Sequence, residues 1–288
     1  MHNTSTVTGT ATDWSPADNP YAIAVSEAQW WQRTVELGVH RLADADGRIS
    51  WFSSRQIDAR QIVVALTQLL NAEQLEQGAL RDLGIDQAVR DALAQARDRF
   101  EAALPGIKHM RDALIHFDEW SRGEGRGPQK NRIRAGASPR EAAREFWGSG
   151  YDPTTRTISH GPYSIDVDAA DQAAAELAHA VYLAAHAVDV RTTARLRSTA
   201  VDALTAAGIT VDGPEAQVRV SPGNDLRIWI SISTATPGDG DEPGQLAEQI
   251  TKSLERAGLR LSSPIQPDQP DAAQRLARGE PVLCDYDT

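Results

Sequence analysis

The chain has 288 residues, of which 41% are hydrophobic and 24% charged, which is the composition of a globular protein with room for two domains. No run approaches the roughly 20 consecutive apolar residues of a membrane span, so no membrane association is expected. The formal net charge of -11 argues against a broad nucleic-acid-binding surface, because an acidic surface repels phosphate at long range. Any contact with nucleic acid must therefore be local.

The N-terminal residues and the single cysteine bear on location. Residues 1–20 are predicted to form a disordered tail, because the first residues are rich in Thr and Ser and lack the basic start and apolar centre of a signal peptide. Cys284, the only cysteine, leaves no partner for an intramolecular disulfide. A reducing cytoplasm is the expected location.

Hydrophobic periodicity predicts four helices in the first part of the chain. Ile57–Leu80 carries apolar residues at spacings of three and four, as an amphipathic helix requires. Similar patterns predict helices over Ser26–Ala43, Asp86–Leu104 and Ile107–Ser121. Four helices joined by short connections are typical of an up-and-down, antiparallel bundle.

The next segment predicts shorter elements. Gly123–Gly136 is rich in glycine and contains a proline, so a loop is predicted there, and a short helix is predicted over Pro139–Trp147. Thr155–Val167 alternates apolar and polar residues around a glycine, which indicates a β-hairpin. A long helix is predicted to begin at Asp168 and to end before Gly208, with its first part closing the bundle.

Beyond Gly208 the pattern changes to short strands and one amphipathic helix. The predicted strands cover Ala216–Val220, Leu226–Ser233, Leu259–Leu261 and Val282–Cys284, and the predicted helix covers Gln245–Ala257. The expected fold is therefore mainly α: an antiparallel helical bundle with a β-hairpin insertion over residues 21–190, then a small α+β module over residues 191–288. The module carries no recognised motif, and a structural or oligomerisation role is the simplest interpretation.

Candidate catalytic residues lie in one predicted helix and precede a basic segment. Arg111 keeps its charge at every physiological pH, and His116 titrates near neutrality. The basic segment, residues 122–144, holds seven basic residues against two acidic ones, Glu124 and Glu141. The basic residues are Arg122, Arg126, Lys130, Arg132, Arg134, Arg140 and Arg144. This asymmetry favours local binding of phosphate.

The helix advances about 100° per residue, which separates an apolar side from a polar side. The apolar side comprises Ile107, Met110, Leu114 and Phe117, and the polar side comprises His109, Asp112, His116 and Glu119. Arg111 and Asp118 lie in or beside the apolar side, so they either form a buried ion pair or line a cleft. Asp112, one turn before His116, would orient the imidazole and raise its pKa.

Two other interpretations of the polar side remain open. It could be an ordinary solvated helix face. It could also bind zinc or iron, provided that a second helix supplied a further ligand. We expect neither a metal nor another cofactor.

Arg111 and, after four intervening residues, His116 resemble the Arg-x(4–6)-His signature of the HEPN superfamily (higher eukaryotes and prokaryotes nucleotide-binding domain). The resemblance covers roughly Ala22 to Asp189. It implies a compact helical bundle that carries the signature on a late helix. It further implies a metal-independent endoribonuclease of a bacterial toxin–antitoxin or antiphage system, active as a homodimer with the signature helices facing each other. An antitoxin or a regulatory protein would be a partner.

This resemblance implies a mechanism for RNA cleavage. His116 acts as general base on the ribose 2′-OH, and Arg111 neutralises charge on the non-bridging phosphate oxygens, which yields a 2′,3′-cyclic phosphate. Asp112 or Glu119 would orient the imidazole. On a straight helix Arg111 and His116 lie about 140° apart, so they converge only if the helix distorts or a second copy contributes. We favour the second copy, which predicts an obligate dimer.

Further residues would bind the RNA. The predicted backbone contacts are Arg122, Arg126, Lys130, Arg132 and Arg134, which make affinity dependent on salt. Trp120 or Trp147 could stack on an unpaired base, although a core position is the simpler interpretation of each. Two alternatives differ in class: a HEPN-like RNA- or nucleotide-binding or regulatory module without catalysis, and a helical scaffold whose basic segment meets an acidic protein.

Overall fold

The computed structural model describes residues 15–44, 47–49, 51–209, 211, 216–222, 227–234, 243–262 and 271–286. It is mainly helical with small antiparallel sheets, which confirms the predicted fold class. Most of the predicted tail lies outside the described residues, and Pro16–Asp18 forms a single 3-10 turn. No helix among the described residues is long and apolar enough to cross a membrane.

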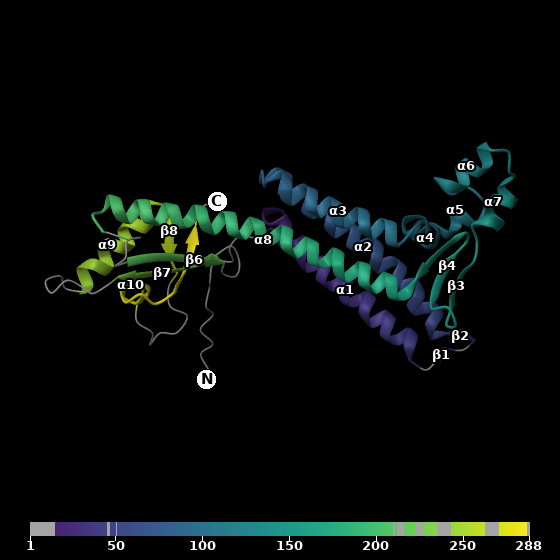
Figure 1. Cartoon of the computed structure of the whole chain (residues 1–288), viewed down its shortest axis with the longest axis horizontal. Coiled ribbons are helices and arrows are strands. Elements are labelled where there is room, and N and C mark those ends of the chain that lie inside the picture. The colour runs from purple at the N-terminus through teal and green to yellow at the C-terminus, as the bar shows by residue number, and fades with distance from the viewer. Residues whose placement is uncertain are drawn as a thin grey trace, which may run out of the picture. The chain divides into compact units, whose positions relative to one another are not determined.

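The chain divides into two compact units, which we call the helical unit, Met1–Ala187, and the α+β unit, Val188–Thr288. The helical unit contains α1 (Pro20–Ala43), β1 (Arg48–Ile49), β2 (Phe52–Ser53), α2 (Ser54–Asp82), α3 (Gln87–Ala103), α4 (Ile107–Ile115), α5 (Phe117–Ser121), α6 (Pro128–Arg134), α7 (Pro139–Glu145), β3 (Ser149–Asp152), β4 (Thr157–His160), β5 (Tyr163–Asp166) and the first part of α8 (Val167–Ala206). Figure 1 labels most of these elements.

The long helices of the helical unit form because their apolar residues recur at helical spacing. Ile62, Leu66 and Leu69 of α2 are fully buried, as are Leu177 and Val181 of α8. Each set repeats every three or four residues, so one side of each helix enters a common core. α1 packs along α2, and α2 also contacts α3 and α4. The four-helix prediction is confirmed for α1, α2 and α3, whereas the fourth helix is interrupted.

A three-stranded antiparallel sheet, ordered β3-β4-β5, packs against the helices. The predicted hairpin is confirmed as β4 and β5, and β3 was not predicted. Tyr151, Ile158 and Ile165 are register neighbours across the three strands, and all three are buried. The Gln56 side chain of α2 ties the sheet edge to the bundle. It donates to the Tyr151 carbonyl (3.1 Å) and accepts from the Tyr151 N–H (2.9 Å).

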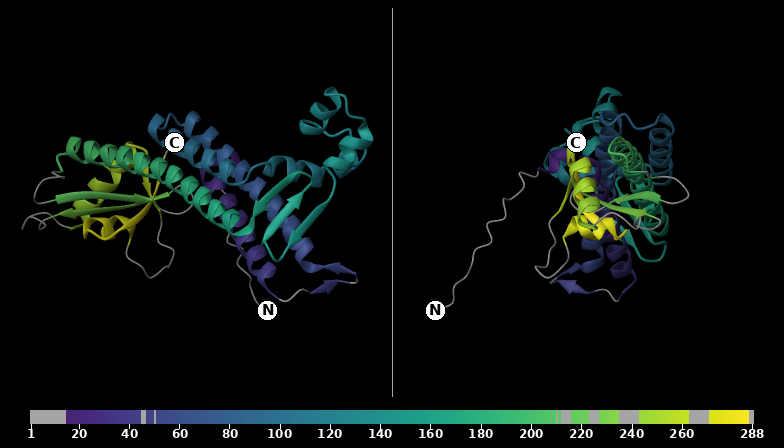
Figure 2. Two further views of the ribbon diagram at one scale, coloured as in Figure 1. Left: turned by 45° about the vertical axis from the view of Figure 1, so that its right-hand side comes forward. Right: turned by 90° about the vertical axis from the view of Figure 1, so that its left-hand side faces the viewer.

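The predicted loop over Gly123–Gly136 is wrong in its second half, where Pro128–Arg134 forms α6. Pro128 occupies the first helical turn, where its missing N–H costs nothing and its fixed φ suits the helix. Figure 2 shows α6 and α7 side by side, set apart from α1 and α2. The short predicted helix is confirmed as α7, which begins at a capping box formed by Ser138 and Glu141.

The α+β unit contains the second part of α8, β6 (Ala216–Pro222), β7 (Arg227–Thr234), α9 (Pro243–Arg256), β8 (Leu259–Leu261), α10 (Ala272–Ala277) and β9 (Val282–Tyr286). All four predicted strands and the predicted helix are present, and α10 was not predicted. The antiparallel sheet has the order β6-β7-β9-β8. Leu196 and Leu204 of α8, with Ile250 of α9, pack on Ile230 in its core.

Candidate functional site

The helix predicted over Ile107–Ser121 is interrupted at His116, because α4 ends at Ile115 and α5 begins at Phe117. His116 has φ −105° and ψ 39°, outside the helical region, and its side chain is exposed. Its carbonyl accepts hydrogen bonds from the first turn of α5, at 3.1 Å from Glu119 and 3.0 Å from Trp120. The straight-helix separation of about 140° between Arg111 and His116 therefore does not apply.

Arg111 pairs with its sequence neighbour instead of with Asp118. The guanidinium lies 2.9 Å from the Asp112 carboxylate, and the two side chains are 33% and 40% exposed. Asp118 is exposed on α5. Of the two arrangements expected for Arg111 and Asp118, a buried ion pair or a cleft, the ion pair does not form, because the helix is interrupted at His116 and Asp118 belongs to α5.

Neither predicted orienting carboxylate is hydrogen-bonded to the imidazole within the described residues. The Asp112 carboxylate faces Arg111, and the bond between Asp112 and His116 is a backbone one, from the His116 N–H to the Asp112 carbonyl (2.8 Å). Glu119 is half-buried in the first turn of α5. The imidazole is exposed to solvent, so a ligand can reach it at the interruption between α4 and α5.

The apolar side of α4 is confirmed in part. Ile107 and Met110 are buried and Leu114 is half-buried, but Phe117 is 60% exposed. Ile115, on the other side of His116, is 52% exposed. The interruption explains this difference, since Phe117 belongs to α5 and not to the core side of α4. The exposed histidine is thus flanked by two exposed apolar side chains.

The remaining histidine of the predicted polar side packs in the fold. The His109 ring lies 5.3 Å from the ring of Tyr163 on β5. Burial raises the pKa of the Tyr163 phenol, with a smaller contribution from Glu145. Within the described residues, no group of three or more His, Cys, Asp or Glu side chains could hold a metal ion. α8 does carry a Glu-x-x-His pair, Glu176 and His179, but both side chains are exposed.

The α5–α7 cluster, residues 117–147, is built around a buried aromatic pair and one buried amide. Trp120 is 2% exposed and meets Phe146 edge to face, with ring centroids 5.9 Å apart. The fully buried Gln129 of α6 donates to the Trp120 carbonyl (2.9 Å) and accepts from the Gly125 N–H (2.8 Å). A Cβ at Gly125 would lie 2.9 Å from the Trp120 ring, so this glycine permits close packing. Trp120 is therefore a core residue, whereas Trp147 is 53% exposed.

The five predicted RNA-binding residues fall into two groups. Arg122 pairs with Glu124 at 2.9 Å, and Arg132 pairs with Glu145 at 2.7 Å. The other three are exposed and make no ion pair within the described residues. They are Arg126, Lys130 and Arg134, which are spaced four residues apart. This spacing places Lys130 and Arg134 on one side of α6.

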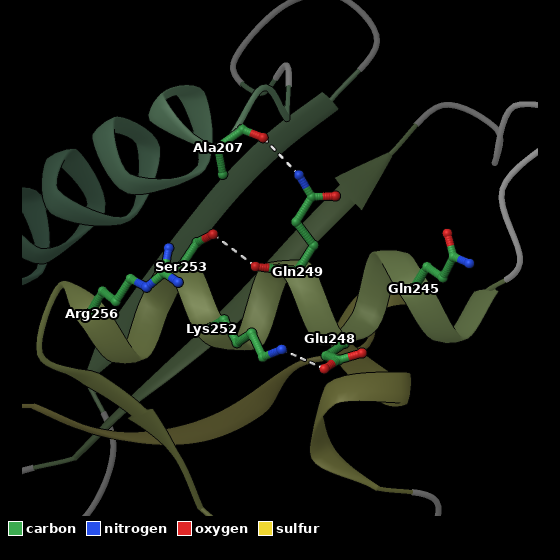
Figure 3. A pocket seen from close by; sticks show the side chains of 7 residues that line it. All are labelled: Ala207, Gln245, Glu248, Gln249, Lys252, Ser253 and Arg256. Atoms are coloured by element: carbon green, nitrogen blue, oxygen red, sulfur yellow. Dashed lines mark hydrogen bonds and ion pairs between the residues drawn. The ribbon is translucent and has the colours of Figure 1, made fainter.

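Described residues also line two hollows elsewhere, and no predicted site residue is among the residues that line them. A groove of about 560 Å³ between α3 and α8 is lined mainly by small or apolar side chains, among them Val89, Leu93 and Leu183. A hollow of about 380 Å³ along α9 is polar (Figure 3). In the second hollow the Gln249 side chain donates to the Ala207 carbonyl (2.7 Å), so part of its polar lining is already satisfied.

Two features of this region were not expected from the sequence as favoured outcomes. The first is the interruption at His116: a distorted helix was one of two ways considered to bring Arg111 and His116 together, but no glycine or proline marks the position. The second is the exposure of Phe117, which follows from the interruption. Comparison of the chain with protein-family models, with curated proteins and with solved structures finds no match.

Proposed function

We propose that the chain binds single-stranded RNA at α4 and the α5–α7 cluster and cleaves it without a metal ion, as a homodimer. The observation that carries this proposal is the exposed His116 at the interruption between α4 and α5, five residues after Arg111. His116 removes the proton of a ribose 2′-OH, and the 2′ oxygen attacks the adjacent phosphorus. The 5′ oxygen leaves with a proton from solvent, and a 2′,3′-cyclic phosphate forms.

Arg111 stabilises the phosphorane by neutralising its non-bridging oxygens. It must first exchange Asp112 for phosphate. An ion pair this exposed contributes at most about 1 kcal/mol, so a charge-assisted, two-pronged contact with phosphate is enough to displace it. Arg126, Lys130 and Arg134, which make no ion pair to any described residue, then contact the RNA backbone, which makes binding depend on salt. Asp112 and Glu119 act on the imidazole only after such a rearrangement.

The second candidate function is RNA binding without cleavage. The observation that favours it is the Arg111–Asp112 pair itself, because a carboxylate beside the guanidinium lowers the local positive potential. Such a protein would be a regulatory module that uses the same basic side chains. In the first case a toxin or antiphage effector, held inactive by an antitoxin or regulatory protein, is the biological role that the HEPN resemblance suggests.

Cleavage of single-stranded RNA in the presence of EDTA separates the two candidates. The wild type should release fragments with cyclic phosphate ends, and Arg111→Ala and His116→Ala should each abolish release. His40→Ala, which removes another exposed histidine on α1, should leave the rate unchanged. Binding with no release supports the second candidate. Activity that EDTA removes and zinc restores contradicts both.

Mixing the two inactive variants tests the dimer. If Arg111 of one copy acts with His116 of the other, a mixed dimer retains one intact site and activity reappears. If both residues act within one copy, the mixture stays inactive. A wild-type protein that remains monomeric at all concentrations while cleaving RNA would contradict the dimer.

A further inference from the structure

The sheet of the α+β unit has one face in the core and one face outside it. Ile230 of β7, a core residue, is aligned with Val282 of β9, also in the core, and with Val220 of β6, which is partly buried against it. Successive residues of a strand point to opposite faces, so the residues between them share the other face. None of the described side chains on that outer face is buried. α8, α9 and α10 all contribute to the core on the first face.

A tryptophan occupies the middle of the outer face. Trp229 lies on the inner strand β7 and is 40% exposed. Its register neighbours are Ser221 on β6 and Leu283 on β9. A small hydroxyl on one side and an aliphatic chain on the other frame an aromatic surface that carries no charge of its own.

Arginines surround this tryptophan. Arg227 lies two residues before Trp229 on the same strand, and Arg219 lies diagonally across from it on β6, each about 7 Å away between Cα atoms. Arg260 on β8 aligns with Asp285, which aligns with Arg227. Among the described residues of the outer face, three arginines against one aspartate give a local positive charge in a chain of net charge -11.

We infer that the outer face of the β6-β7-β9-β8 sheet binds single-stranded nucleic acid, with Trp229 stacked on an unpaired base and Arg219 and Arg260 contacting phosphates. Stacking requires an exposed base surface, which a duplex conceals and a single strand offers. The arginines supply the complementary charge. An acidic peptide would use the arginines but would leave the tryptophan without a partner. This site is separate from α4 and the α5–α7 cluster and does not depend on cleavage.

Binding is measured by fluorescence anisotropy on the full chain carrying His116→Ala, so that no RNA is cut. The probes are short labelled single-stranded RNA, single-stranded DNA and a blunt RNA duplex. Trp229→Ala should weaken single-strand binding roughly ten-fold, and Trp229→Phe should keep most of it. Trp51→Ala removes a more exposed tryptophan in the helical unit and serves as the matched control. Arg219→Gln should lower the slope of log affinity against log salt by about one.

The same variants are repeated in a Lys130→Gln/Arg134→Gln background, which removes the contacts proposed for α6. Loss of affinity on Trp229→Ala in this background supports the inference even if the proposed cleavage fails. Ultraviolet cross-linking is done on the chain that carries only His116→Ala, so the sheet is not substituted and its folding is not affected. The RNA or DNA should become attached to the peptide that contains Trp229. A preference for RNA over DNA indicates contacts to the 2′-OH, and equal affinity indicates base and phosphate contacts alone; either supports the inference.

Three results would overturn it: equal affinities for Trp229→Ala and Trp51→Ala, duplex binding as tight as single-strand binding, or cross-links confined to the helical unit. Binding of an acidic peptide with no binding of oligonucleotides would also overturn it and would assign the face to a protein partner.

Discussion

Replacing Gln129 by alanine tests whether one buried amide holds the α5–α7 cluster together. The substitution removes the acceptor of the Gly125 N–H and the donor to the Trp120 carbonyl. Both residues remain buried, so water reaches these groups poorly. An unsatisfied buried polar group costs about 1–3 kcal/mol. The Trp120 carbonyl keeps its hydrogen bond from the Gly123 N–H (3.2 Å), so the Gly125 N–H is the group that loses its partner. The expected loss is about 2 kcal/mol, or about 30-fold in the opening equilibrium of the cluster.

Hydrogen exchange measured by mass spectrometry reports this opening directly. A melt of a chain with two units need not be a single transition, whereas exchange resolves the peptides over residues 117–147. These peptides should exchange about 30-fold faster in Gln129→Ala. Asn131→Ala, which alters an exposed residue of the same helix, should change exchange only slightly. If both variants exchange alike, the two hydrogen bonds do not hold the cluster and the reasoning fails.

Three further outcomes are expected. Gly123→Ala should destabilise the α5–α7 cluster by about 2 kcal/mol or more, measured by hydrogen exchange over residues 117–147, because φ is +76° and a Cβ would lie 2.1 Å from the Pro139 carbonyl oxygen of α7. Gly136→Ala, with φ +98° but open space, should cost less. Burial, and secondarily the charge of Arg60, lowers the pKa of His160 in the folded protein. Below pH about 6.5 the unfolded chain therefore binds more protons than the folded one, so the free energy of unfolding should fall as the pH drops towards the pKa of His160 in the folded state. Urea midpoints for His160→Leu should lack that slope, and an unchanged slope would assign the pH dependence elsewhere. Burial raises the pKa of the Cys284 thiol to about 12, so iodoacetamide should alkylate it only as fast as the α+β unit unfolds; rapid labelling of native protein would contradict its burial.

The long helices and the strands could be predicted because their signals are local. The apolar residues of α2 repeat at helical spacing over its whole length, and the alternation through β4 and β5 surrounds the turn at Gly161. α8 contains no glycine or proline over its 40 residues. In each case the local sequence pattern and the packing of the element in the core favour the same secondary structure.

The interruption at His116 could not be predicted, since its cause is distant in sequence. α5 departs from the axis of α4 to place Trp120 against Phe146, which lies 26 residues further along the chain. Glycine weakens helix prediction, which led to the loop expected over residues 123–136. α6 nevertheless forms, and Gln129 fastens it to the backbone of Trp120.

The candidate site was predictable as a list of side chains but not as an arrangement. Charge alone could not show that Arg132 is neutralised by Glu145, 13 residues away, while Lys130 two positions earlier is unpaired within the described residues. Nor could the pattern of β7 show which of its two faces the helices cover. Which basic side chains form ion pairs, and which face of the sheet the helices cover, are determined by tertiary structure. The experiments on α6 and on Trp229 depend on these two properties.

The sharing of α8 between the two units has a practical consequence for dissecting the chain. Leu177 is buried in the helical unit and Leu196 in the α+β unit, and continuous helix connects them. A fragment that stops at Ala187 breaks hydrogen bonds that cross the cut, and a fragment that starts at Val188 opens with four unsatisfied amide groups. A fragment that retains all of α8 exposes the apolar residues of α8 that pack in the core of the deleted unit, and such exposure promotes aggregation. Truncation is therefore a poor route to assigning activities, and point substitutions in the intact polypeptide are the better one.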